Sequence, residues 1–194
     1  AFCAHPIRNH QHGAETVIQV AFEGVIGSGK TTLANLYARH TSSQLILETF
    51  DENPFLAKFY DNKDTWASRM QLWFAAERAK QLSAQNTMTA GNNAFVSDFS
   101  FQKEHVFGQM LLRGDELELH RTYLDLLEPT ALRPKLVAML DAKTDRLLER
   151  IQRRGRAYET AIDDKYLQEV RHAYHNHYPW DQTNMIRIDT TDLD

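Results

Sequence analysis

The stretch Gly24-Val-Ile-Gly-Ser-Gly29-Lys30-Thr31 decides the fold of this chain. It matches the pattern G-x-x-x-x-G-K-[ST] in full, and it lies between an apolar, β-branched run at residues 17–22 and a helical pattern at residues 30–39. Glycines let the backbone wrap closely around a phosphate, so that several N–H groups point inward. The N-terminus of the helix adds positive potential there. The sequence therefore predicts a phosphate-binding loop between a strand and a helix.

Each polar position of this loop has an expected role. Lys30 is expected to reach the β- and γ-phosphates of a nucleotide, and Thr31 to hold Mg²⁺. The other nucleotide-binding positions of the loop are Gly24, Gly27, Ser28, Gly29 and Thr32. A glycine-rich turn that matches by chance is the competing interpretation, but it does not explain why strand, motif and helix coincide. ATP and Mg²⁺ are the expected ligands, whereas the loop does not identify the phosphoryl acceptor.

Short apolar runs alternate with helical patterns along the rest of the chain. Further strands are predicted at residues 45–47, 94–97, 136–140 and 185–188, and helices at residues 65–88, 101–112, 115–127, 144–153 and 163–177. Asn53-Pro54 is a typical helix start, with Asn as the cap and Pro at the first helical position. Alternating strands and helices predict a parallel sheet. The expected fold is α/β, a five-stranded parallel sheet flanked by helices on both faces.

Composition and charge restrict the class of protein. The chain has 194 residues, of which 42% are hydrophobic and 25% charged, and we expect a tail at residues 1–15 and one domain at residues 16–194. The net charge of −4 argues against nucleic acid as a partner. No apolar run approaches the ~20 residues that span a bilayer, and the single cysteine, Cys3, cannot form an internal disulfide. We therefore expect a cytoplasmic protein with a small-molecule substrate and no membrane partner.

Acidic residues follow three of the predicted strands, at the edge of the sheet where doubly wound folds bind their ligands. They are Glu48, Asp98 and Asp141. Phosphoryl transfer to an alcohol needs one carboxylate that takes the hydroxyl proton, and acids around Mg²⁺. Glu48 and Asp98 are the best placed, because they follow strands near the phosphate loop, whereas Asp141 is interpreted as a turn or cap residue. A solvated loop charge is the alternative for each of them.

A basic cluster around Gly155 follows the fourth predicted strand. Arg150 and Arg153 fit a helix end whose dipole they complement. Arg154 and Arg156, however, flank a glycine beyond that helix. We interpret them as a lid that closes over the transferring phosphates, neutralises charge in the transition state and excludes water.

The order of several motifs along residues 17–192 resembles the deoxynucleoside kinase family, in particular its bacterial deoxyadenosine and deoxyguanosine kinase-like branch. These motifs are the loop from Gly24 to Thr32, Glu48 followed by Asn53-Pro-Phe-Leu and Phe59-Tyr60, Trp66 and Gln71, Val96-Ser-Asp98, and the segment from Arg150 to Glu159. Many families share the loop alone, whereas the ordered combination is specific. The resemblance implies a P-loop kinase that transfers the γ-phosphoryl group of ATP to the 5′-hydroxyl of a deoxynucleoside, with purines preferred.

The resemblance also implies how the acceptor is held. Glu48 is similar to the general base that accepts the 5′-hydroxyl proton, and Tyr60 and Glu159 are similar to the pair that holds the 3′-hydroxyl. Gln71 resembles the amide that pairs with the nucleobase edge, and Trp66 resembles a wall of the same pocket. The structural alternatives are a core aromatic for Trp66, a helix-surface amide for Gln71, and a tyrosine that covers the core for Tyr60.

On the nucleotide side, the resemblance assigns the remaining residues. Arg154 and Arg156 resemble the lid arginines that act with Lys30 as charge stabilisers, and Asp98 resembles an acid that helps to bind Mg²⁺. Asp192 lies where the family places the loop that covers the adenine of ATP. Kinases of this family are commonly dimers packed through helices, so a homodimer is expected.

One departure from the family pattern concerns the residues after the third strand. The family has Asp or Glu followed by Arg and Ser, whereas this chain has Asp98-Phe99-Ser100. In the family this arginine lies near the 5′-oxygen and the phosphates. Lys103, early in the following helix, is the predicted replacement.

Two other functions stay open at this point. A thymidylate-like or other nucleoside monophosphate kinase would need additional arginines for the acceptor phosphate, and Glu48 and Phe99 argue against it. A non-catalytic nucleotide-binding module of a fusion protein is compatible with Phe99 and with the missing initiator Met. A non-catalytic module would need none of the catalytic groups, yet the chain retains Lys30, Thr31, Glu48 and the lid.

Overall fold

The computed structural model describes residues 18–83, 94–179 and 184–193, and the predicted tail lies outside them. Within the described residues, five parallel strands form one sheet in the order β2-β3-β1-β4-β5, which confirms the predicted fold. The strands are β1 (Ile18–Gly24), β2 (Gln44–Ile46), β3 (Ala94–Ser97), β4 (Leu136–Asp141) and β5 (Met185–Asp189).

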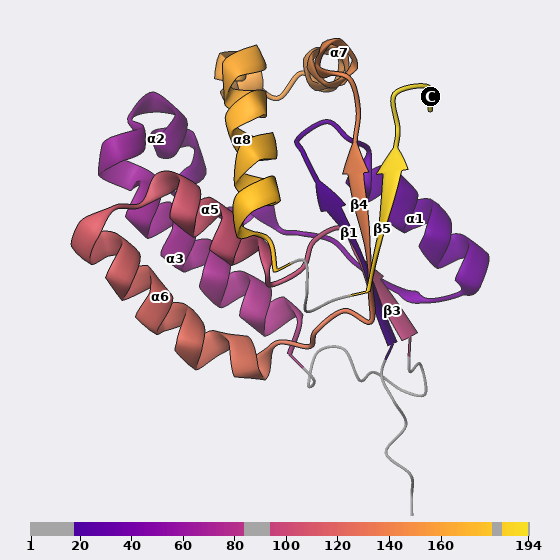
Figure 1. The fold of residues 1–194 in the computed structure, drawn as a ribbon, viewed down its shortest axis with the longest axis horizontal. Coiled ribbons are helices and arrows are strands. Elements are labelled where there is room, and N and C mark those ends of the chain that lie inside the picture. The colour runs from indigo at the N-terminus through magenta and orange to yellow at the C-terminus, as the bar shows by residue number, and fades with distance from the viewer. Residues whose placement is uncertain (1–17, 84–93, 180–183, 194) are drawn as a thin grey trace, which may run out of the picture.

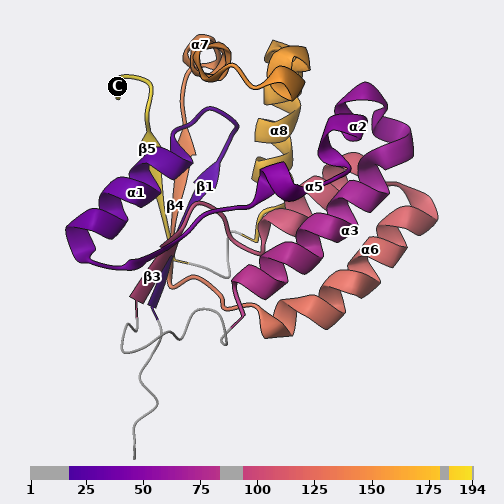
Figure 2. The ribbon, with the colours of Figure 1, turned by 180° about the vertical axis from the view of Figure 1, so that it is seen from behind.

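Helices cover both faces of this sheet. They are α1 (Lys30–Thr41), α2 (Leu56–Asp61), α3 (Lys63–Gln81), α5 (Lys103–Leu111), α6 (Gly114–Leu127), α7 (Thr144–Arg154) and α8 (Asp164–His177), with short 3-10 turns η1 (Phe50–Glu52), η2 (Glu128–Thr130) and η3 (Ala157–Ala161). Figures 1 and 2 show α1 on one side of the sheet and α3, α5, α6 and α8 on the other. None of the described helices is long and apolar enough to cross a membrane.

Alternating side chains of β1 hold the layers together. Val20 and Phe22 pack on one face, in a cluster with Ala34 of α1. Ala21, between them, lies in the cluster of the opposite face, with Val170 of α8. Successive side chains of a strand point to opposite faces, so a strand that is buried on both faces must be apolar throughout. This is why the strands appear in the sequence as short continuous apolar runs.

A further layer of helices packs beyond β3. Phe95 and the neighbouring Phe99 lie in a buried cluster with Ala75 and Ala79 of α3 and Leu124 of α6. Large aromatic rings contribute much of the apolar area that such a cluster buries. This packing joins α3 and α6 to the aromatic residues of β3 and of the turn that follows it.

The strand order brings the predicted site residues together. β1 pairs with β3 on one side and with β4 on the other, so the chain changes direction across the sheet at β1. The carboxyl ends of β1, β2 and β3 lie at one edge, which is where open α/β sheets bind ligands. Gly24, Glu48 and Asp98 lie at or just beyond these ends.

Two predictions about helix boundaries are wrong. The helix predicted at residues 65–88 ends at Gln81, because the chain turns away to pair with residues after α6: Leu132 donates its N–H to the carbonyl of Leu82 at 3.0 Å. Residues 84–93 lie outside the described part of the chain. Asn53-Pro54 does not start a helix, since α2 begins at Leu56. Instead, the buried Asn53 amide accepts from the N–H of Phe55 at 2.9 Å and donates to the carbonyl of Met70 at 3.2 Å.

Candidate active site

The phosphate loop connects β1 to α1 as predicted. Gly24 has φ 132°, and a Cβ at this position would lie 1.9 Å from the carbonyl oxygen of Leu140 on β4. Gly29, the residue before α1, has φ 94°. Both positions therefore require glycine, one because of the neighbouring strand and one because of the backbone conformation. The loop thus leaves the N-terminus of α1 facing the cavity described below.

Lys30 is folded back on the loop. Its Nζ donates to the carbonyls of Gly24 and Val25, each at 2.9 Å. Burial lowers the pKa of Lys30 to about 8, and the nearby cation Lys103 adds to the effect. Two carbonyls are weak partners for an ammonium group compared with phosphate oxygens. The arrangement therefore favours exchange of these contacts for an anionic ligand.

Asp98 joins three elements at the carboxyl edge of the sheet. One oxygen, Oδ2, accepts from the Thr31 hydroxyl at 2.5 Å, and the other, Oδ1, accepts from the N–H of Glu48 at 2.9 Å. A hydroxyl and a carboxylate oxygen in contact form a suitable partial ligand set for Mg²⁺, which keeps several waters and takes its other ligands from substrate phosphates. Within the described residues no group of three or more His, Cys, Asp or Glu could hold a metal.

Glu48 is held by two cations. Arg78 of α3 donates to Glu48 Oε1 through Nε at 2.7 Å and also through one terminal nitrogen. Lys103 of α5 lies 2.8 Å from Glu48 Oε2. Burial alone would raise the pKa of Glu48, but Arg78 and Lys103 outweigh it and lower this pKa to about 2. The carboxylate is therefore ionised at neutral pH, as a group that accepts a proton must be.

Phe99 and Lys103 point to different parts of the molecule. Phe99 is fully buried, and its ring packs between α3 and α6 rather than facing the phosphate loop. Lys103, on the first turn of α5, reaches the carboxylate of Glu48. Lys103 is therefore one of the two cations that bind Glu48, together with Arg78, and its role as the replacement for the family arginine stays a prediction.

Sequence reasoning missed Arg78. This residue is 4% exposed and also donates to the buried Glu104 of α5. Arg78 lies seven residues after Gln71, so that two helical turns place both side chains on the same face of α3. That spacing is the one signal that could have pointed to Arg78.

Most of the predicted site residues surround one cavity of about 880 Å³. Oε1 of the buried Gln71 has no hydrogen-bond partner within the described residues, so it can accept from a bound molecule. Of the predicted site residues, the cavity is lined by Gly27, Ser28, Gly29, Lys30, Thr31, Thr32, Glu48, Tyr60, Gln71, Asp98, Lys103, Arg154, Arg156, Glu159 and Asp192. Such a volume is at the upper end for small-molecule sites, which measure ~300–1,000 Å³.

The segment predicted to form a lid lines one side of this cavity. Glu159 pairs with Arg154, at 2.6 and 3.0 Å, and with Arg156 at 3.4 Å. Tyr158 stacks on Tyr60 with ring centroids 5.8 Å apart. Burial and the nearby carboxylate of Glu159 raise the pKa of Tyr60 to about 12, so its hydroxyl stays protonated. Both lid arginines thus share one carboxylate at the cavity wall.

Trp66 is not among the residues that line this cavity. Its ring stacks on Phe55, with centroids 5.9 Å apart, and Lys58 and Arg69 lie over it at 4.7 and 5.1 Å from the centroid. The structure thus places Trp66 in the packing between α2 and α3, whereas the other predicted acceptor residues face the cavity.

The loop after β5 packs against the phosphate loop. Thr190 donates from its hydroxyl to the carbonyl of Ser28 at 3.0 Å, and Arg150 donates to the carbonyl of Thr190 at 2.6 Å. Asp192, two residues further on, lines the cavity. Arg150 therefore supports this loop and is not one of the two arginines that bind Glu159.

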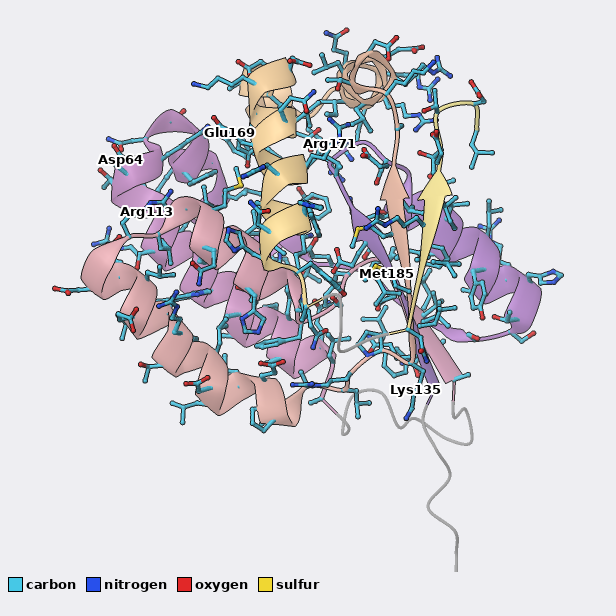
Figure 3. The ribbon with its side chains drawn as sticks, viewed as in Figure 1. Asp64, Arg113, Lys135, Glu169, Arg171 and Met185 are labelled. Carbon is cyan, nitrogen blue, oxygen red and sulfur yellow. The ribbon has the colours of Figure 1, made fainter. Side chains whose placement is uncertain are left out.

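Another cavity, of about 1060 Å³, lies between α8 and the strands β4 and β5. Figure 3 shows Arg171 on α8, on the side of the sheet, and its guanidinium pairs with Asp141 at 2.8 and 3.0 Å. Asp141 also accepts from the N–H of Ala142 at 2.8 Å, in agreement with the turn role expected for it. This cavity is lined by none of Lys30, Glu48 and Asp98, so the smaller cavity is the candidate active site.

The fold and this cavity define a P-loop kinase. The model of the deoxynucleoside kinase family matches residues 20–194, and the chain belongs to this family. A deoxyguanosine kinase from Bacillus subtilis (strain 168) is 32% identical over 152 residues, which cover 78% of this chain and 73% of the relative. A deoxyadenosine/deoxycytidine kinase from the same organism is 30% identical over 178 residues, or 88% and 80% of the two chains. The chain is thus an ATP-dependent kinase.

A solved structure shows the same fold. It is a deoxyadenosine kinase from M. mycoides with bound dCTP, and it superimposes with a TM-score of 0.78 over 91% of this chain and 92% of that chain. The two sequences are 20% identical, so this likeness supports the fold alone.

Proposed function

We propose that this protein transfers the γ-phosphoryl group of ATP to the 5′-hydroxyl of a deoxynucleoside, with purine deoxynucleosides preferred. The observation that carries the proposal is the single cavity shared by Lys30, Asp98 and Glu48, which brings a phosphate-binding loop and an ionised carboxylate together. Each of the two relatives is named for a purine deoxynucleoside, which supports the preference, although the second is also named for deoxycytidine.

In the proposed reaction Glu48 accepts the proton of the 5′-hydroxyl. The 5′-oxygen forms a bond to the γ-phosphorus as the bond from that phosphorus to the bridging oxygen of ADP breaks in line. Lys30 and the lid arginines stabilise the charge on the transferring group, and Lys103 adds a cation on the acceptor side. Mg²⁺, held through Thr31 and Asp98, would neutralise phosphate charge when bound.

The acceptor end of the cavity suits a deoxynucleoside. Tyr60, whose hydroxyl is protonated, and Glu159 can donate to and accept from a 3′-hydroxyl. The amide of Gln71 and the guanidinium of Arg78 both line the cavity from one face of α3, and they supply the donors and the acceptor that a nucleobase edge needs. Trp66, predicted as part of the same pocket, would act only through its packing on Phe55 and α2.

The charge balance of the cavity favours a neutral acceptor over a nucleoside monophosphate. Arg78 and Lys103 are the cations near Glu48, and Arg78 is paired with two carboxylates. An acceptor phosphate would have to displace those buried pairs, which is costly. A deoxynucleoside leaves the pairing of Arg78 with Glu104 intact.

The assembly and location of the protein are also proposals. A homodimer packed through helices and a cytoplasmic location would both be typical of this kinase family. Sedimentation velocity over a range of protein concentrations would test the dimer, and a single species at the mass of one chain would contradict it.

The decisive experiment measures ATP consumption with Mg²⁺ against the four common deoxynucleosides and their 5′-monophosphates, with Lys30→Ala as the blank. Turnover with a purine deoxynucleoside that the blank lacks would support the proposal. Turnover with monophosphates alone would reassign the protein as a nucleoside monophosphate kinase. ATP binding without turnover on any acceptor would indicate a non-catalytic nucleotide-binding module.

A further inference from the structure

A buried chain of polar groups runs from α6 to the carboxylate of Glu48. His120 of α6 is 1% exposed, and its Nε2 lies 3.3 Å from Oε2 of Glu104. Glu104 is fully buried, and its other oxygen, Oε1, accepts from Arg78. Arg78 in turn donates to Glu48. His120 is therefore connected to the active site although it does not line the cavity.

The hydrogen bond between His120 and Glu104 has a defined direction. Glu104 is paired with a guanidinium, so it is a carboxylate and only accepts hydrogen bonds. Nε2 of His120 must then carry the hydrogen. Without this donor, Oε2 of Glu104 would be a buried carboxylate oxygen without its partner, which is costly.

Steric contact fixes the other edge of the His120 ring. A Cβ placed on Gly108 of α5 would lie 2.6 Å from both Cε1 and Nδ1 of His120. The ring therefore occupies the space that a side chain at residue 108 would need. It is held between the backbone of α5 on one edge and the carboxylate of Glu104 on the other.

Arg78 contacts both Glu104 and Glu48, so the position of Glu104 affects the wall of the cavity where the substrate is proposed to bind. One terminal nitrogen binds Glu104, while Nε and the other terminal nitrogen bind Glu48. A guanidinium is planar and rigid, so a rotation of Glu104 moves all of these nitrogens together. Such a movement would displace Arg78 beside Gln71, at the wall where the nucleobase is proposed to bind.

We propose that His120 is a positioning residue for nucleobase selection, which acts through Glu104 on Arg78. The proposal rests on the proposed function, because it assumes that the nucleobase binds at Gln71 and Arg78. It predicts that changes at His120 alter the affinity for the deoxynucleoside and the discrimination among bases, but not the affinity for ATP.

The test compares His120→Leu, which removes the donor, with His120→Gln, whose amide places a donor near the position of Nε2. The control is His105→Gln. His105 on α5 also pairs with a glutamate, Glu128 at 3.2 Å, but it is partly exposed and its glutamate is not the one that binds Arg78. Steady-state kinetics give KM and kcat for each deoxynucleoside and KM for ATP, and thermal unfolding checks that each variant is folded.

For His120→Leu we expect KM for the preferred deoxynucleoside to rise about tenfold, which corresponds to the loss of one buried charge-assisted hydrogen bond. The ratio of kcat/KM between the best and worst base should fall by a similar factor, while KM for ATP stays within about twofold. His120→Gln should recover most of the lost affinity and discrimination. His105→Gln should have the kinetic constants of the parent protein. Unchanged discrimination in a folded His120→Leu protein would overturn the proposal.

A measurement on the unaltered protein keeps the proposal testable if His120→Leu does not fold. Long-range ¹H–¹⁵N NMR of the histidine rings should show that Nε2 of His120 carries a hydrogen, with shifts that respond to a deoxynucleoside but not to Mg²⁺–ATP. A His120 ring that responds to neither would contradict the proposal. Absence of turnover with every deoxynucleoside in the unaltered protein would instead contradict the proposed function.

Discussion

Arg78 Nε lies 2.7 Å from Glu48 Oε1, so the proposed catalytic base is bound by a guanidinium. The contact keeps Glu48 ionised but also occupies an oxygen that must accept the 5′-hydroxyl proton. A carboxylate has enough acceptor positions for both partners. Arg78 therefore orients Glu48 without blocking it, and its removal should change how Glu48 titrates.

Replacement of Arg78 by Met should bring the ionisation of Glu48 into the measurable range. Arg78 favours the charged form and lowers the pKa of Glu48 to about 2, so the loss of Arg78 should raise that pKa toward its ordinary 4.5. The acid limb of the kcat/KM profile, which reports the free enzyme, should move up by about one to two pH units. Arg69→Met is the control, because Arg69 lies on the same helix over Trp66. Identical acid limbs in both variants would contradict this account.

The binding of ATP should weaken above pH 8 because of Lys30. Burial lowers the pKa of this ammonium to about 8 in the free protein, so that higher pH leaves a neutral amine that attracts phosphates poorly. Between this pKa and the higher pKa of the bound state, the Kd for Mg²⁺–ATP should rise about tenfold per pH unit. Isothermal titration calorimetry from pH 6 to 9.5 measures this. Lys30→Arg, which stays charged, should show a much flatter dependence, and equal slopes would argue against the assignment.

The strands and the phosphate loop could be predicted because their signals are local. Burial on both faces of the sheet forces continuous apolar runs, and the close approach of Gly24 to Leu140 forces a glycine. The end of α3 could not be predicted, since it depends on a contact distant in sequence. Leu82 leaves the helix to accept from the N–H of Leu132, fifty residues later. The sequence of the helix itself contains no pattern that indicates the contact with Leu132.

The site could be predicted where its residues follow strands or flank a glycine, as Glu48, Asp98 and Arg156 do. Arg78 and Glu104 lie inside helices, where a charged residue is ordinarily on the solvent face. Their burial depends on mutual pairing across α3 and α5, which neither helix shows alone. An apolar helix face likewise does not distinguish a pocket wall from packing, which is why Trp66 stays a prediction only.

Lys103→Ala should reduce kcat/KM for the deoxynucleoside by about 10²–10³-fold. Lys103 lies 2.8 Å from Glu48 and supplies the cation that Phe99 cannot. Lys165→Ala is the matched control, because the side chain of Lys165 is 84% exposed and its partner Glu169 lies at 3.9 Å. The control should stay within about twofold of the parent. If both variants keep the parental kcat/KM, Lys103 is not the replacement for the family arginine.

Phe99→Arg, which would restore the family residue, should destabilise this protein rather than activate it. The ring of Phe99 is fully buried among Ala75, Ala79 and Leu124, so an arginine there would place an unpaired charge in an apolar cluster. We expect the free energy of unfolding to fall by about 4 kcal/mol or more, against about 1 kcal/mol for Phe99→Leu. Urea denaturation of both variants measures the difference. A stable Phe99→Arg protein with raised kcat would show instead that residue 99 can turn toward the phosphates, and that the packing between α3 and α6 does not require the ring.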